Sequence, residues 1–158
     1  MEMKKFTPAD KSVFLEMCRD FYSGGAASAP IPESRMEKTF DLIAAGTPYA
    51  FGYLFITGGS AAGYAIGFPF YSNEAGCFCL MLEEIYVKPG FRSQKLGSQY
   101  LATVADVLSA DLGVPFEGLK LEICPSNERA HKLYTAMGFE ALVYTNMVKK
   151  VQRADAEN

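Results

Sequence analysis

The segment from Arg92 to Ser98, RSQKLGS, combines two cationic side chains with small and polar ones directly before a predicted helix. The N-terminus of a helix presents free backbone N–H groups and the positive end of the helix dipole, which together favour an anion such as phosphate. Arg92 offers a planar fork of donors, Lys95 offers a point charge, and Gly97 with Ser98 lets the backbone approach a ligand. The turn is either a phosphate site or an ordinary solvated turn. It matches neither GxxxxGKS/T nor GxGxxG.

A second segment, NERAHKLYTAMGF, begins at Asn127 and is predicted to be a helix. An apolar stripe recurs within it at helical spacing, formed by Ala130, Leu133, Tyr134 and Met137. The ring of Tyr134 is therefore expected to face the sheet. Spacing alone favours a core tyrosine whose hydroxyl is satisfied locally.

Together the two segments resemble the GNAT N-acetyltransferase superfamily. In that family an R/Q-x-x-G-x-G/A turn binds the pyrophosphate of acetyl-coenzyme A, and a later helix reads N-x-x-A-x-x-L-Y-x-x-x-G-F. The first motif is matched by Arg92, Leu96 and Gly97. The second is matched in full, by Asn127, Ala130, Leu133, Tyr134, Gly138 and Phe139. The resemblance is close from Leu82 to about Phe139, whereas the N-terminal part agrees only in the order of its elements.

The resemblance implies that acetyl-CoA is the co-substrate. Its pyrophosphate would lie against the turn, and its pantetheine amides would pair with the backbone near Ile85 and Val87, much as an added strand does. Asn127 would be a helix cap, a coenzyme ligand, or both. The residues expected to bind the coenzyme are Ile85, Val87, Arg92, Ser93, Gln94, Lys95, Leu96, Gly97, Ser98, Asn127, Ala130 and Tyr134.

Lys95 departs from the family pattern, because the first motif expects a glycine there. If this position needs a positive φ, a residue other than glycine costs about 1–3 kcal/mol. Either the turn is shaped differently, or the lysine ammonium offsets the strain by pairing with a phosphate. We favour the second interpretation.

The catalytic residues implied by the resemblance are Tyr134, Glu83 and Glu84. Tyr134 would protonate the departing thiolate, since a phenol with a pKa of about 10 is protonated at neutral pH. Glu83 and Glu84 follow an apolar run on a strand, and neighbouring strand residues point to opposite faces. Only one of them can face a given cleft and accept a proton from the attacking ammonium. Glu83 is the preferred candidate, and Glu84 would instead form a salt bridge on the opposite face.

The predicted function is N-acetyl transfer from acetyl-CoA to a primary amine of a small molecule or peptide by direct attack, without an acyl-enzyme. Two other functions stay open: a non-catalytic acyl-CoA sensor on the same fold, and a nucleotide-binding protein that uses the same anion site. The sequence does not select the acceptor amine.

The elements that position these residues alternate between strands and helices. Strands are predicted at 3–7, 49–56, 61–71, 76–89, 119–124 and 139–149, and helices at 8–22, 33–46, about 96–112 and 125–138. The predicted fold is α/β, a mixed and mostly antiparallel central sheet flanked by helices (the acyl-CoA N-acyltransferase fold). Residues 1–150 are expected to form a single acetyltransferase domain, and 151–158 a frayed C-terminal tail.

Composition and charge argue against several other classes of protein. A net charge of −3 and a pI near 5.2 argue against a nucleic-acid partner. The uncharged stretch 42–73 is interrupted by glycines and prolines and alternates with period two, so it predicts strands and no membrane span. Four cysteines without a CxxC pair, beside one histidine, indicate no metal site and reduced thiols, hence a cytoplasmic protein. The fold is compatible with a homodimer.

Overall fold

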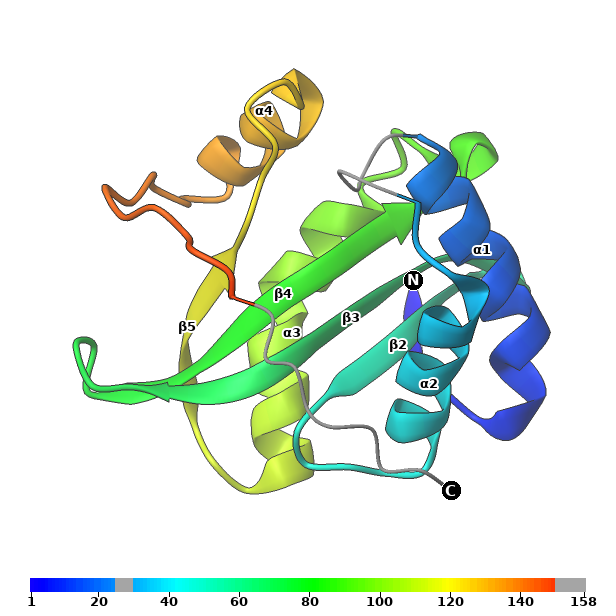
Figure 1. Ribbon diagram of the computed structural model, residues 1–158, viewed down its shortest axis with the longest axis horizontal. Coiled ribbons are helices and arrows are strands. Elements are labelled where there is room, and N and C mark those ends of the chain that lie inside the picture. The colour runs from blue at the N-terminus through cyan, green and yellow to red at the C-terminus, as the bar shows by residue number, and fades with distance from the viewer. Residues whose placement is uncertain (25–29, 150–158) are drawn as a thin grey trace.

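A computed structural model describes residues 1–24 and 30–149 (Figure 1). The elements in chain order are β1 (Glu2–Lys5), the short 3-10 helix η1 (Pro8–Asp10), α1 (Lys11–Ser23), α2 (Glu33–Ala44), β2 (Phe51–Thr57), β3 (Ser60–Ser72), β4 (Cys77–Val87), a second 3-10 helix η2 (Pro89–Phe91), α3 (Leu96–Leu112), β5 (Phe116–Leu121) and α4 (Glu128–Ala136). The predicted tail, 151–158, lies outside the described residues.

The strands form one sheet in the order β1-β2-β3-β4-β5. The first three neighbouring pairs are antiparallel, and only the pair of β4 and β5 is parallel. The prediction of a mixed, mostly antiparallel sheet flanked by helices is therefore confirmed. Figure 1 shows α1 and α2 on one face, α3 on the other, and α4 beyond the β5 edge.

Alternating side chains divide the core into two layers. Phe51, Tyr53 and Phe55 of β2 pack with Leu80 and α3 on one face. The opposite face packs against α1 and α2 through a cluster of aromatic rings that includes Phe6, Phe14, Phe40 and Tyr64. The helix predicted at about 96–112 is confirmed as α3, which buries Leu101, Val104 and Leu108 against the sheet. Burial of these apolar side chains is the main force that holds the helices on the sheet.

The prediction of a final strand at 139–149 is wrong, because the described residues there form no strand. The side chains of Val143, Met147 and Val148 are more than 90% exposed, at 93%, 94% and 92%. Within the described residues, side-chain contacts hold this segment near the rest of the fold, among them the hydroxyl of Tyr144 donating to Glu74 at 3.0 Å. Alternation of apolar residues describes what a strand could bury, but a strand forms only where a neighbouring strand pairs with it.

Candidate active site

Glu83 occupies a β-bulge in β4. On β3, Ile66 pairs with Glu84 and the next residue, Gly67, pairs with Leu82, so Glu83 is an extra residue without a partner. A bulge bends its strand and reverses the alternation of faces beyond it. Before the bulge, Leu82 packs on the α3 side; after it, Tyr86 packs on the α1 and α2 side.

The bulge coincides with the end of pairing between β4 and β5. The last pair in this ladder is Leu82 with Leu121, whereas β4 continues to Val87. From Glu83 onward, β4 therefore does not pair with β5. Figure 1 shows the two strands diverging, with β5 leading away from β4 to α4. The diverging ends leave backbone groups of β4 free for an extended ligand.

Glu83 is the more accessible of the two candidate carboxylates. Its side chain reaches solvent. Partial burial raises the pKa of Glu83 above its ordinary value, and the nearby Glu122 carboxylate raises it further. Glu122 follows directly after β5, so Glu83 lies on the side where β4 and β5 separate.

Glu84 lies on the other face, and among residues 1–24 and 30–149 it does not form the predicted salt bridge. The side chain is only 8% exposed, and its carboxylate accepts hydrogen bonds from the hydroxyls of Tyr22 and Tyr64, the latter at 2.6 Å. Burial raises the pKa of Glu84, although the two tyrosines partly offset this effect. These tyrosine partners could not be recognised from the sequence, because they come from α1 and β3, far from Glu84 along the chain.

The turn before α3 has a strained backbone. Ser93 and Lys95 have φ of 67° and 60°, and in the described part of the chain they are the only residues other than glycine with positive φ. Lys95 is the N-cap residue of α3, and no side chain caps the helix. Left-handed residues other than glycine cost about 1–3 kcal/mol each and cluster at functional sites. Lys95 therefore adopts the positive φ for which the family pattern has a glycine.

Most side chains of this turn are exposed to solvent and accessible to a ligand. Arg92, Ser93, Gln94 and Lys95 are exposed, whereas Leu96 is buried and anchors the helix. The Nε atom of Arg92 donates to the carbonyl of Val87 at 3.0 Å, which holds the guanidinium near the end of β4. Two cations thus stand beside the uncapped amides at the start of α3.

The helix α4 places Tyr134 on the same side of the sheet as α3. Tyr134, Ile85 and Val87 all pack against the core layer beneath α3. A Cβ atom built on Gly97 would lie 3.4 Å from Leu133, so the α3 turn and α4 are in contact. Burial raises the pKa of Tyr134, and within the described residues its hydroxyl makes no hydrogen bond.

Asn127 caps α4, because its side-chain oxygen accepts a hydrogen bond from the amide of Ala130 at 3.1 Å. His131, on the same helix, is exposed. Cys124 ends the segment predicted as a strand, and a buried, apolar environment is expected for it there; instead the thiol is exposed, lies 3.0 Å from the Ser126 hydroxyl, and has a pKa lowered by that hydrogen bond. It follows the end of β5, where the strand has left the sheet and no longer has a neighbour to cover it.

Other features of the described residues bear on function. No group of three metal-ligating side chains occurs among residues 1–24 and 30–149, and the four cysteines are free thiols. Within the same ranges, every helix is too short or too polar to cross a membrane.

The sequence profile of the acetyltransferase (GNAT) family matches residues 13–139. The chain is 38% identical over 85 residues to thialysine N-ε-acetyltransferase of Bos taurus, a match that covers 54% of this chain and 48% of the relative. The matched region thus spans about half the length of that curated relative.

Three solved structures share the fold. A possible acetyltransferase from Clostridium difficile 630 superposes with a TM-score of 0.79 at 10% identity, covering 96% of this chain and 98% of that one. The aminoglycoside N-acetyltransferase AAC(6')-Iy in complex with CoA gives 0.74 at 19% identity, covering 94% and 93%. The ribosomal-protein-alanine N-acetyltransferase of Brucella melitensis biovar Abortus 2308 gives 0.70 at 16% identity, covering 96% and 100%.

Proposed function

The chain belongs to the acetyltransferase (GNAT) family, and on this premise we propose that it transfers the acetyl group of acetyl-CoA to a primary amine of a small molecule or peptide. One observation carries the proposal. β4 separates from β5 at the bulge of Glu83 and then leads into the uncapped, cationic N-terminus of α3. A strand edge and an anion site in succession suit a ligand with an amide-bearing arm and a diphosphate.

The coenzyme would be held by the turn and by the free edge of β4. The amides of Leu96, Gly97 and Ser98 would donate to the pyrophosphate, and Arg92 with Lys95 would supply charge. The backbone near Ile85 and Val87 would pair with the pantetheine amides, and one of these amides would stabilise the oxyanion of the thioester. The carbonyl of Val87 already accepts from Arg92, so Arg92 would also fix the position of that strand end.

Glu83 would act as the general base. The acceptor arrives as an ammonium and loses a proton to the Glu83 carboxylate, directly or through water. Its nitrogen then forms a bond to the acetyl carbon, the bond from that carbon to sulfur breaks, and the nitrogen releases a second proton to solvent to leave a neutral amide. The raised pKa of Glu83 makes it a stronger base than an ordinary glutamate, which supports this role.

Tyr134 would protonate the departing sulfur. Its hydroxyl is uncommitted within the described residues, and burial raises its pKa, so it holds its proton at neutral pH. Solvent then returns the proton to Tyr134. Direct transfer needs no nucleophilic side chain on the protein.

The acceptor is proposed only as a class. The relatives are named for thialysine, aminoglycosides and the alanine of a ribosomal protein, all of which carry amines. A suitable panel therefore contains thialysine, an aminoglycoside, a polyamine and a peptide with N-terminal alanine. Release of free thiol from acetyl-CoA is the readout.

Calorimetry with coenzyme A and with ATP separates the three functions. We expect binding of coenzyme A in preference to ATP, and thiol release with at least one amine. Coenzyme binding without turnover on any amine would support the sensor, and preference for ATP would support the nucleotide-binding protein.

A further inference from the structure

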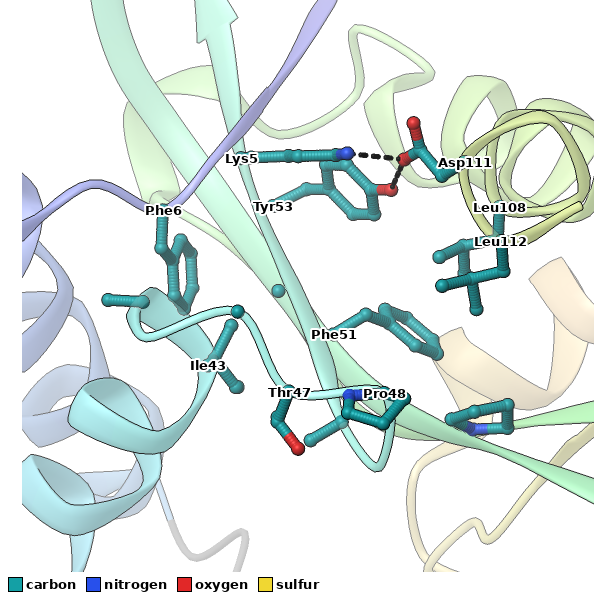
Figure 2. Close-up of a pocket in the computed structure, with 15 residues that line it drawn as sticks. Lys5, Phe6, Ile43, Thr47, Pro48, Phe51, Tyr53, Leu108, Asp111 and Leu112 are labelled. Carbon is teal, nitrogen blue, oxygen red and sulfur yellow. Dashed lines mark hydrogen bonds and ion pairs between the residues drawn. The ribbon is translucent and has the colours of Figure 1, made fainter.

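A cavity of about 450 Å³ lies at the end of α3 opposite the cationic turn (Figure 2). α3 has 17 residues, so its two ends are about 24 Å apart at 1.5 Å per residue. The cavity is lined by Leu108 and Leu112 near the C-terminus of that helix. It is therefore separate from the proposed transfer site.

The cavity exists because β1 is shorter than β2. β1 ends at Lys5, opposite Tyr53, so Phe51 and Gly52 at the start of β2 have no neighbour on that side. The ring of Phe6 fills part of the gap and lies so close to Gly52 that an added Cβ atom would be 2.5 Å from it. The remaining space is open between the α2 layer and the α3 layer.

Most of the wall is apolar, and its polar groups converge at one end. Figure 2 shows Phe6 and Ile43 facing Phe51, Leu108 and Leu112 across the cavity. At one end, the Lys5 ammonium and the Tyr53 hydroxyl both contact the same oxygen of Asp111, Oδ2, each at 2.9 Å. An apolar cavity of this size with a few convergent polar groups has the anatomy of a small-molecule site.

The ion pair of Lys5 and Asp111 leaves hydrogen-bonding groups available to a ligand. In the described residues, Oδ1 of Asp111 has no partner, and the Lys5 ammonium uses one of its three N–H donors. Burial would raise the pKa of Asp111, but hydrogen bonds from Lys5 and Tyr53 lower it below the ordinary value, so the group is an anion at neutral pH. The Lys5 side chain is 65% exposed and free to adjust.

We propose that this cavity binds an apolar α-amino acid as its zwitterion. The ligand carboxylate would accept from Lys5, its ammonium would donate to Asp111, and its side chain would fill the space between Phe6 and Phe51. A ligand with a single charge would leave one like-charge contact at the pair, whereas a zwitterion satisfies both members without adding net charge.

The experiment is calorimetric titration of the apoprotein with L-leucine and L-phenylalanine, without acetyl-CoA. We expect saturable binding of at least one. N-acetylleucine lacks the ammonium and leucinamide lacks the carboxylate, so each should bind at least tenfold more weakly than leucine. Lys5→Met and Asp111→Asn should weaken leucine or phenylalanine binding at least tenfold.

Two further variants complete the test. Lys11→Met removes the ion pair of Lys11 with Asp41, also 2.9 Å long but outside the cavity, and should leave binding unchanged. Leu112→Trp fills the cavity, so it should abolish binding and leave acetyl transfer intact. Absence of saturable binding up to about 10 mM, or binding that ignores Lys5→Met and Leu112→Trp, overturns the proposal. Because neither result involves acetyl transfer, failure here leaves the proposed enzyme activity standing.

Discussion

Ser93 and Lys95 lie two positions apart, and both hold left-handed backbone angles in the turn that leads into α3. The two residues share the strain but differ in charge. A pair of glycine substitutions therefore separates the backbone contribution from the electrostatic one.

Lys95→Gly should stabilise the fold by about 1 kcal/mol, because glycine adopts a positive φ without strain. It should also weaken coenzyme A binding about three- to tenfold at low salt, since the ammonium is lost, and the difference should shrink as salt screens the phosphate. Calorimetry at two ionic strengths measures both. Ser93→Gly is the matched control for the backbone: it should give the same gain in stability, and because no charge is lost, any change in affinity should not depend on salt. Unchanged affinity in Lys95→Gly would remove the proposed pairing with phosphate.

Glu83→Gln should lower kcat/KM by about 10²–10⁴-fold, the usual contribution of a general base. In the unmodified protein, activity should fall as the pH drops through the pKa of Glu83, which burial and Glu122 place above the ordinary value for glutamate. The acid limb of the pH profile should be absent in Glu83→Gln. Glu122→Gln should move that limb to lower pH, because it removes the neighbouring negative charge. An acid limb that persists in Glu83→Gln would assign the base elsewhere.

Tyr134→Phe should lower kcat about 10²-fold and leave the affinity for coenzyme A nearly unchanged, since it removes only the proton donor. A proportional loss of affinity would indicate a structural role instead.

Tyr100 on α3 has a hydroxyl to which, unlike that of Tyr134, we assign no role in the reaction. Its hydroxyl is fully buried and has no hydrogen-bond partner within the described residues. An unsatisfied buried hydroxyl costs about 1–3 kcal/mol, so Tyr100→Phe should raise the free energy of unfolding by that order. Urea denaturation gives the value. Destabilisation would mean that the hydroxyl has a bound water or other partner.

Glu84 should make stability depend on pH. Burial raises its pKa in the folded state above the unfolded value, so the folded state binds the proton more tightly. The stabilisation is complete below the ordinary glutamate pKa and is lost as the pH rises through the raised one. Glu84→Gln should remove the contribution of Glu84 and leave that of Glu83, whose pKa burial also raises, so thermal unfolding across about pH 4–8 should show a smaller slope in the variant. The same slope in both proteins would show that another group causes it.

The sequence predicted those parts of the fold that depend on local pattern. The turn at Gly58 and Gly59 joins β2 to β3 as a tight hairpin, and both glycines have positive φ. α3 begins at Leu96 and ends before Gly113, in agreement with the helix predicted at about 96–112. The cationic turn was recognisable because its residue types alone suit an anion.

The rest depends on contacts between distant parts of the chain. Nothing in the local pattern of β4 marks Glu83 as a bulge, because the extra residue appears only in the register with β3. The tyrosines that bind Glu84 and the ion pair of Lys5 with Asp111 likewise join separate elements. The predicted strand at 139–149 failed for the same reason, since its alternation says nothing about whether a partner strand is present.

The extra residue in β4 separates the chemistry from the packing of the sheet. Leu82 and Glu84 pair with consecutive residues of β3, so deleting Glu83 would join them into a regular strand and leave Glu84 and Tyr86 on the α1 and α2 side. The residue that would accept the acceptor's proton is thus one that strand pairing with β3 does not need. The chain inserts a carboxylate into the sheet without giving up any contact of the core.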